Sequence, residues 1–289
     1  MISSSVIAGC MRWGTWGAKF STQEYSTLIQ QCIENGMTTF DHADIYGHYT
    51  TEAEFGRALA LKPEIRKNIQ LITKCGINLV TENRPQHTIK SYNTSAKHII
   101  SSVEQSLKNL CTDYLDCLLI HRPDPLLNAE EVAETIDTLI QSGKVLEFGV
   151  SNFLPHQSAL LQQNINLAYN QIELSLTHTD PLTDGTLEYA MQNGTGIMVW
   201  SPLGKGIFAG DHPKKEALIN LFNQLSEKYN CQPSQIPIAW LNQLPCKPIP
   251  VIGSTQLNRI VQAKEALNIA LKREDWYRLL EVAIGKEVA

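Results

Sequence analysis

Polar side chains stand at the ends of several short apolar runs, and their types suit acid-base chemistry and hydrogen bonding to a ligand. In chain order they are Asp41 with Tyr46 shortly after it, Lys74, His121, Ser151 with Asn152, Gln171, Trp200 with Ser201, and Gly253 with Ser254. Polar groups at the ends of apolar strands are costly to desolvate unless they are paired. Their recurrence therefore indicates one shared site.

Each titratable residue also has an ordinary interpretation when it is taken alone. A lone Asp at a strand end is more often a turn or cap residue, and a lone Lys is usually a solvated charge. His121 could be a core histidine, Tyr46 could be ordinary packing beside Gly47, and Asp44 is a rival carboxylate. If all four residues had only structural roles, their ordered appearance at strand ends would require four separate coincidences. The ordered set therefore favours a functional site.

The elements that would position these residues are short buried strands alternating with longer amphipathic stretches, the rhythm of βαβ units. Near-continuous apolar character suits a parallel sheet covered by helices. Eight such strands with intervening helices favour a (β/α)₈ TIM barrel over an open sheet. The predicted strands are 6–10, 38–41, 70–74, 115–121, 146–151, 167–171, 196–200 and 249–253.

Local capping signals predict several of the helices. Ser21 or Thr22 begins one that ends at Gly36, and Asn128 with Glu131 resembles the capping box of one that ends near Gly143. Further predicted helices run from 94 or 95 to 110, from 254 or 255 to 268, from 236 to 244 and from 274 to 283. No linker divides the chain, so residues 1–289 are predicted to form one domain. The polar segment 76–93 is a candidate substrate loop or a surface insertion.

Composition excludes several classes of protein. A net charge of −5 argues against a nucleic-acid binder, and no apolar run is long enough to cross a membrane. The N-terminus lacks a secretory signal, and the seven scattered cysteines include no CxxC pair, so we expect reduced thiols in the cytoplasm. We expect a monomer or weak homo-oligomer that acts on a small molecule.

The chain resembles the aldo-keto reductase family over essentially its whole length, and is most similar to the shorter bacterial branch. Each matching segment is weak alone, but their order, each after its own strand, is specific. They are 41–47 (DHADIYG), 72–74 (ITK), 119–123 (LIHRP), 149–153 (GVSNF), 170–173 (NQIE) and 200–203 (WSPL).

The resemblance implies a catalytic tetrad of Asp41, Tyr46, Lys74 and His121. Reducing a carbonyl requires a proton on oxygen, and a phenol with its ordinary pKa of about 10 is a slow donor at neutral pH. We expect Lys74 to lower the pKa of Tyr46, the general acid, and Asp41 to hold Lys74 in place. His121 would hydrogen-bond the substrate oxygen.

The resemblance also implies a nicotinamide cofactor at the barrel mouth, since no Rossmann GxGxxG follows a first strand. Its carboxamide would contact Ser151, Asn152 and Gln171, and its ring would stack on Trp200, where many members have tyrosine. The pyrophosphate would meet Ser201, Leu203, Gly204 and Gly206. The implied 2′-phosphate site comprises Gly253, Ser254 and Arg259, which favours NADPH.

Two departures from the family pattern keep NADH (NAD) as the less favoured alternative. Some members carry a lysine where Gly253 stands, so one positive charge is absent from the phosphate site. Gln262 and Ala263 also differ from the acidic and amide pair that often contacts adenine.

Met11, Arg12 and Trp13 follow the first strand and are predicted to form one wall of the substrate site. Arg12 suggests an anionic substrate, although a surface salt bridge is the favoured alternative. Trp13 is either an apolar platform or a plug beneath the N-terminal segment.

The expected activity is therefore NADPH-dependent reduction of an aldehyde or ketone. A first alternative is a regulatory or sensor barrel that binds NADP(H) with little turnover, as potassium-channel auxiliary subunits of this superfamily do. A second is a cofactor-free hydrolase or isomerase, which would need a metal cluster or paired carboxylates. Its nearest candidate, His42, Asp44 and His48, lacks a convincing third ligand from a neighbouring strand, so no metal is expected.

Overall fold

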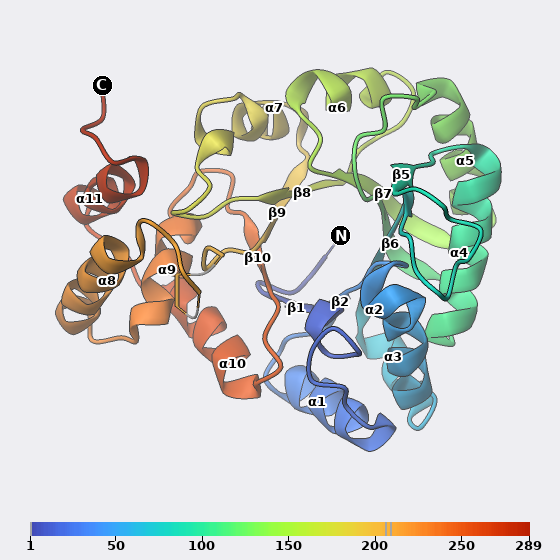
Figure 1. Ribbon diagram of the computed structural model, residues 1–289, viewed down its shortest axis with the longest axis horizontal. Coiled ribbons are helices and arrows are strands. Elements are labelled where there is room, and N and C mark those ends of the chain that lie inside the picture. Colours follow the sequence, from blue (N-terminus) through green and yellow to red (C-terminus); the bar gives the residue numbers. More distant parts are fainter. Residues whose placement is uncertain (1, 206, 209) are drawn as a thin grey trace.

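The computed structural model describes residues 2–205, 207–208 and 210–289. Gly206, one of the predicted pyrophosphate contacts, lies outside the described residues. Within them a closed barrel of parallel strands has the order β1-β10-β9-β8-β7-β6-β3-β2 (Figure 1). The strands are β1 (Ile7–Gly9), β2 (Thr39–Asp41), β3 (Gln70–Cys75), β6 (Leu115–Ile120), β7 (Val145–Ser151), β8 (Tyr169–Glu173), β9 (Gly196–Trp200) and β10 (Ile249–Ile252). The predicted TIM barrel is confirmed.

Helices surround this barrel, and the further C-terminal helices predicted from sequence are present as α9 and α11. The helices are α1 (Thr22–Glu34), α2 (Tyr46–Tyr49), α3 (Thr51–Leu59), α4 (Ala96–Leu110), α5 (Ala129–Gln141), α6 (Pro155–Gln162), α7 (Thr186–Asn193), α8 (Lys215–Tyr229), α9 (Ile236–Asn242), α10 (Leu257–Glu265) and α11 (Arg273–Ile284). None of the described helices has the length and apolar character needed to cross a bilayer.

Two of the helix starts show how local sequence sets these elements. Ser21 and Glu24 form a reciprocal capping box at α1. Asn128 caps α5 by accepting from the backbone N–H of Glu131, but the Glu131 carboxylate accepts from the backbone N–H of Ala96 instead. The predicted reciprocal box at α5 is therefore wrong, because Glu131 links α5 to the neighbouring α4.

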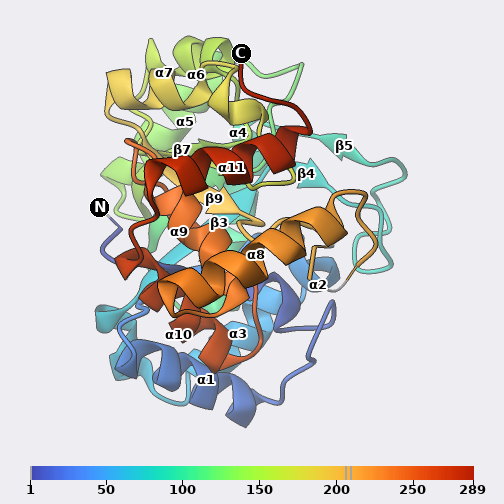
Figure 2. The same ribbon diagram turned by 90° about the vertical axis from the view of Figure 1, so that its left-hand side faces the viewer.

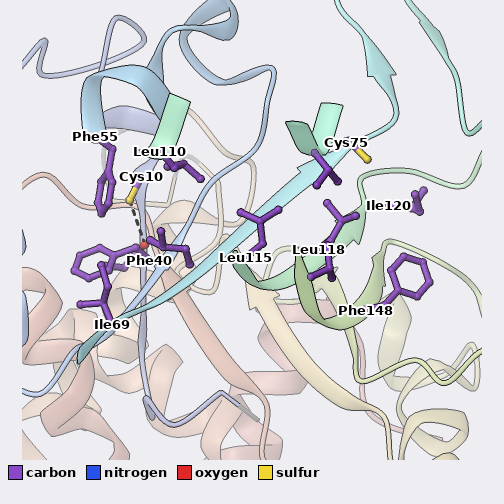
Figure 3. Close-up of a cluster of buried hydrophobic side chains, with 14 of the residues drawn as sticks. Cys10, Phe40, Phe55, Ile69, Cys75, Leu110, Leu115, Leu118, Ile120 and Phe148 are labelled. Carbon is purple, nitrogen blue, oxygen red and sulfur yellow. Dashed lines mark hydrogen bonds between the residues drawn. The ribbon is translucent and has the colours of Figure 1, made fainter. Parts of the chain in front are cut away.

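Side chains alternate between the two faces of each strand, so one set faces the helices and the other fills the barrel. In Figure 3, Phe40 of β2 lies in the outer cluster with Phe55 of α3 and Leu110 of α4. The cluster inside the barrel contains Ile7, Ile72, Cys117, Leu119, Tyr169, Met198 and Val251. A residue two positions beyond the last inner side chain of its strand, such as Lys74 after Ile72, therefore points into the mouth at the carboxyl end of the strands.

The loop after β3 carries a small hairpin in which β4 (Ile77–Asn78) pairs antiparallel with β5 (Ser91–Tyr92). Figure 2 shows β4, β5 and α2 at the end of the barrel opposite the N-terminus. The segment 76–93 thus has secondary structure of its own and lies at the mouth, as its place after a strand predicted.

Candidate active site

Asp41, Tyr46 and Lys74 form one buried hydrogen-bonded cluster at the mouth. The Lys74 ammonium donates to both carboxylate oxygens of Asp41 at 2.8 Å and to the carbonyl of His42 at 2.8 Å. It also lies 3.2 Å from the hydroxyl of Tyr46. The structure therefore joins the phenol and the ammonium that the sequence paired.

A turn with unusual backbone geometry presents Tyr46 to Lys74. Tyr46 begins α2, and the next three residues have left-handed φ values of 59° at Gly47, 57° at His48 and 70° at Tyr49. A β-carbon on Gly47 would lie 2.4 Å from the Thr51 hydroxyl, so glycine is required there. Strain of this kind persists only where the surrounding structure holds it, as it often does at functional sites.

Burial raises the pKa of Tyr46, and the nearby charge of Lys74 opposes that rise without cancelling it. The sequence had led us to expect a net lowering. That expectation is wrong, because it considered the ammonium and neglected desolvation of the phenolate. Tyr46 is consequently protonated at neutral pH, the state required of a general acid.

Lys74 keeps its charge in this setting. Burial alone would lower the pKa of Lys74, but Asp41 and Tyr46 raise it to a net value above the ordinary one. The ammonium is therefore available to stabilise a phenolate once Tyr46 has given up its proton.

His121 completes the predicted tetrad from β6. Its ring centre lies 6.1 Å from that of Tyr46 in an edge-to-face arrangement. Burial, helped by the charges of Lys74, Arg122 and Lys90, holds the pKa of His121 well below its usual range. The neutral ring has a buried Nδ1 without a hydrogen-bond partner in the described part of the protein. A neutral imidazole suits a role in orienting a carbonyl oxygen.

The residues predicted to hold nicotinamide form a chain of hydrogen bonds that begins at the tetrad. The Gln171 side-chain amide donates to Asp41 at 2.8 Å, and the Ser151 hydroxyl donates to the backbone carbonyl of Gln171 at 2.8 Å. The Asn152 amide donates to Ser151 at 2.7 Å, and the Trp200 indole donates to Asn152 at 3.0 Å. The sequence did not foresee the bond from Gln171 to Asp41, which connects the two groups of residues.

The segment after β9 has a left-handed backbone at two of the residues predicted to contact the pyrophosphate. Ser201 and Gly204 have left-handed φ values of 53° and 75°, and Leu203 between them is partly buried. The Lys205 ammonium lies 4.5 Å from the ring centre of Trp200 and pairs with Glu173.

The predicted phosphate pocket after β10 has open space beside the backbone of Gly253. A β-carbon on Gly253 would meet no described protein atom within 4 Å, so a ligand could approach the backbone closely here. Arg259 is exposed in the first turn of α10, and Ser254 accepts from the backbone N–H of Gln256 just before that helix. Together with the flat face of Trp200, these features fit a dinucleotide.

The predicted substrate wall is only partly brought to the mouth. Trp13 is fully buried against Tyr25 and Phe40, and its indole donates to the Ser254 carbonyl at 2.9 Å. It is therefore a buried core residue and not the apolar platform for a substrate that the sequence suggested. Met11 and Arg12 are exposed, and Arg12 forms no ion pair with any described residue.

Trp16 is the mouth residue that the sequence analysis missed. Its ring centre lies 6.1 Å from that of Tyr46 and 5.3 Å from that of His48. The available signal was its place in the same segment after β1, three residues beyond Trp13. Of the two indoles, only this half-buried one can contact a substrate beside Tyr46.

His42, Asp44 and His48 do not form a metal centre. His42 is buried against Phe55, with ring centres 4.5 Å apart, whereas His48 is exposed. No group of three or more potential metal ligands occurs among the residues described.

The barrel and this cluster define a class of protein, and comparison with known sequences gives it a name. The family model described as the Aldo/keto reductase family matches residues 5–284. The chain belongs to this family of oxidoreductases.

Curated bacterial relatives match over almost the whole chain. The uncharacterized oxidoreductase YcsN of Bacillus subtilis is 44% identical, covering 99% of this chain and 96% of the relative. The 6-dehydroglucose reductase of Agrobacterium fabrum is 42% identical, covering 99% and 96%. Among solved structures, the glycerol dehydrogenase of Gluconobacter oxydans is 25% identical with a TM-score of 0.85, covering 99% of this chain and 94% of that one.

Proposed function

We propose that the protein reduces the carbonyl of small aldehydes or ketones with NADPH, and that Tyr46 is the general acid. The observation that carries the proposal is the buried contact of 3.2 Å between the Tyr46 hydroxyl and the Lys74 ammonium. A protonated phenol beside a fixed cation is prepared to lose its proton when a carbonyl oxygen gains charge.

Each member of the cluster then has one role. When bound, the nicotinamide supplies the hydride. Tyr46 gives its proton to the carbonyl oxygen, and Lys74 stabilises the phenolate that remains. His121 hydrogen-bonds the same oxygen and sets its orientation, while Asp41 holds the ammonium in place.

The open backbone at Gly253 and the exposed guanidinium of Arg259 at the start of α10 support NADPH as the preferred cofactor. Because Gly253 supplies no charge, NADH remains a weaker second cofactor. Two similar proteins are named for polyhydroxylated compounds, a 6-dehydroglucose reductase and a glycerol dehydrogenase, so hydroxyaldehydes are the first substrates to test.

The test compares the wild type with Tyr46→Phe and with the control Tyr277→Phe on α11. NADPH binding is followed by tryptophan fluorescence, and turnover by loss of absorbance from the reduced nicotinamide. We expect Tyr46→Phe to lower kcat by at least about 10²- to 10⁴-fold, the usual contribution of general acid catalysis, with NADPH binding close to wild type.

Full activity in Tyr46→Phe would contradict the assignment of the acid. Binding of NADPH without reduction of any aldehyde by the wild type would instead support the sensor alternative. Failure to bind a nicotinamide nucleotide at all would contradict both.

A further inference from the structure

Arg122 is a half-buried cation at the mouth to which the proposed reaction gives no role. It directly follows His121 after β6, and its guanidinium carbon lies 5.4 Å from the ring centre of Trp200 on β9. The side chain thus extends from His121 toward the opposite wall of the mouth.

No described carboxylate forms an ion pair with this guanidinium, in contrast to Arg66, which pairs with Asp116 at 2.8 Å. The nearest acidic residue in sequence, Asp124, already accepts from the Thr94 hydroxyl and from the backbone N–H of Leu126. A guanidinium that lies near an aromatic ring but has no anionic partner among the described residues keeps its hydrogen-bond donors for a ligand.

Other cations lie near Arg122 although the chain as a whole has a net charge of −5. Lys90, on the hairpin loop after β3, joins Arg122 and Lys74 in lowering the pKa of the neighbouring His121. Cations beside a site attract ligands of the opposite charge.

Arg122 enters the mouth from a different strand than the residues expected to hold cofactor phosphates, although its guanidinium carbon lies 5.4 Å from the ring centre of Trp200, which directly precedes Ser201. Those residues follow β9 and β10, whereas His121 and Arg122 follow β6, which pairs with β3 and β7. The part of the rim formed by β3 and β6 lies beside the reacting oxygen that His121 would orient.

We propose that Arg122 binds two neighbouring oxygen atoms of the substrate and makes the enzyme selective for oxygen-rich carbonyl compounds. The planar fork of a guanidinium can donate two parallel hydrogen bonds, which match a carboxylate or a pair of adjacent hydroxyls. This inference rests on the proposed reductase activity and extends it to the substrate class.

The experiment uses substrate pairs of equal chain length, propanal with D-glyceraldehyde and butanal with succinic semialdehyde. Arg122→Met should lower kcat/KM for at least one oxygen-rich member by about 10- to 100-fold, the effect of losing hydrogen bonds to a charged group, mainly through KM. The kcat/KM for propanal and butanal should change by less than about twofold, because their only oxygen is that of the carbonyl. A lower kcat/KM for glyceraldehyde identifies adjacent hydroxyls as the group that Arg122 binds, and a lower kcat/KM for succinic semialdehyde identifies a carboxylate.

Arg57→Met, an exposed arginine on the outer helix α3, is the matched control and should leave all four substrates unchanged. Arg122→Lys keeps the charge without the fork, so it should recover only part of the lost selectivity and provides a second folded variant.

Equal losses for apolar and oxygen-rich substrates, no loss for any of them, or weakened NADPH binding in Arg122→Met would each overturn this inference. Wild-type turnover of propanal and butanal tests the proposed reductase activity separately, since those substrates do not need Arg122.

Discussion

Replacing His42 with leucine should remove a component of stability that is lost in acid. The His42 ring is fully buried, packs against Phe55, and has no hydrogen-bond partner on either nitrogen among the described residues. Burial, helped by the charge of Lys74, lowers the pKa of His42 to about 3. The folded protein therefore keeps this ring neutral far below the pH at which an exposed histidine is protonated.

The size of the effect follows from the difference in proton binding. An unfolded histidine has a pKa of about 6.5, so the unfolded chain binds a proton at His42 below that pH. The folded chain binds this proton only when the pH falls to about 3, so between these two values acid favours the unfolded state. The stability that depends on His42 being neutral is fully present above the unfolded pKa of about 6.5, and it is lost as the pH falls from there toward about 3. Between about pH 7 and about pH 5 the integrated loss is about 2 kcal/mol.

Urea denaturation at these two pH values should show that His42→Leu loses about 2 kcal/mol less stability on acidification than the wild type does. His156→Leu, an exposed position on α6, is the control and should follow the wild type. His121 also has a lowered pKa, but it is present in all three proteins and cancels. A stability difference between His42→Leu and wild type that is the same at both pH values would refute the reasoning.

Two further predictions concern the charged groups of the site. Lys74→Met should destabilise the fold by about 3 to 5 kcal/mol, because it leaves the Asp41 carboxylate buried without its partner. Adding Asp41→Asn should recover most of that loss in urea denaturation. A double variant as unstable as Lys74→Met alone would contradict this prediction. Arg259→Ala should weaken NADPH binding by about 10- to 100-fold and NADH binding by less than about twofold in fluorescence titrations, and equal effects on both cofactors would show that the phosphate pocket is misplaced.

The strand periodicity and the order of motifs were readable from the sequence alone. Lys74, His121 and Gln171 each lie two residues beyond an inner apolar side chain, Ile72, Leu119 and Tyr169 respectively. Because side chains alternate in a strand, the strand end also sets which way these polar groups point. Local pattern therefore predicted the barrel and the residues that meet at its mouth.

Which of two nearby indoles faces the mouth was decided only by the tertiary structure. Trp13 and Trp16 lie in one short segment, and burial of Trp13 depends on Tyr25 of α1 and on the Ser254 carbonyl after β10. Ser254 is distant in sequence and meets Trp13 only when β1 closes the barrel against β10.

The pKa of Tyr46 was likewise set by the folded molecule. Spacing identified the ammonium that favours the phenolate, but the stronger opposing effect is desolvation by the whole set of surrounding elements. Chain order thus determined which groups meet at the site. The charge states of these groups depend on how far the folded protein excludes water from them. Residues from many distant parts of the chain contribute to that burial.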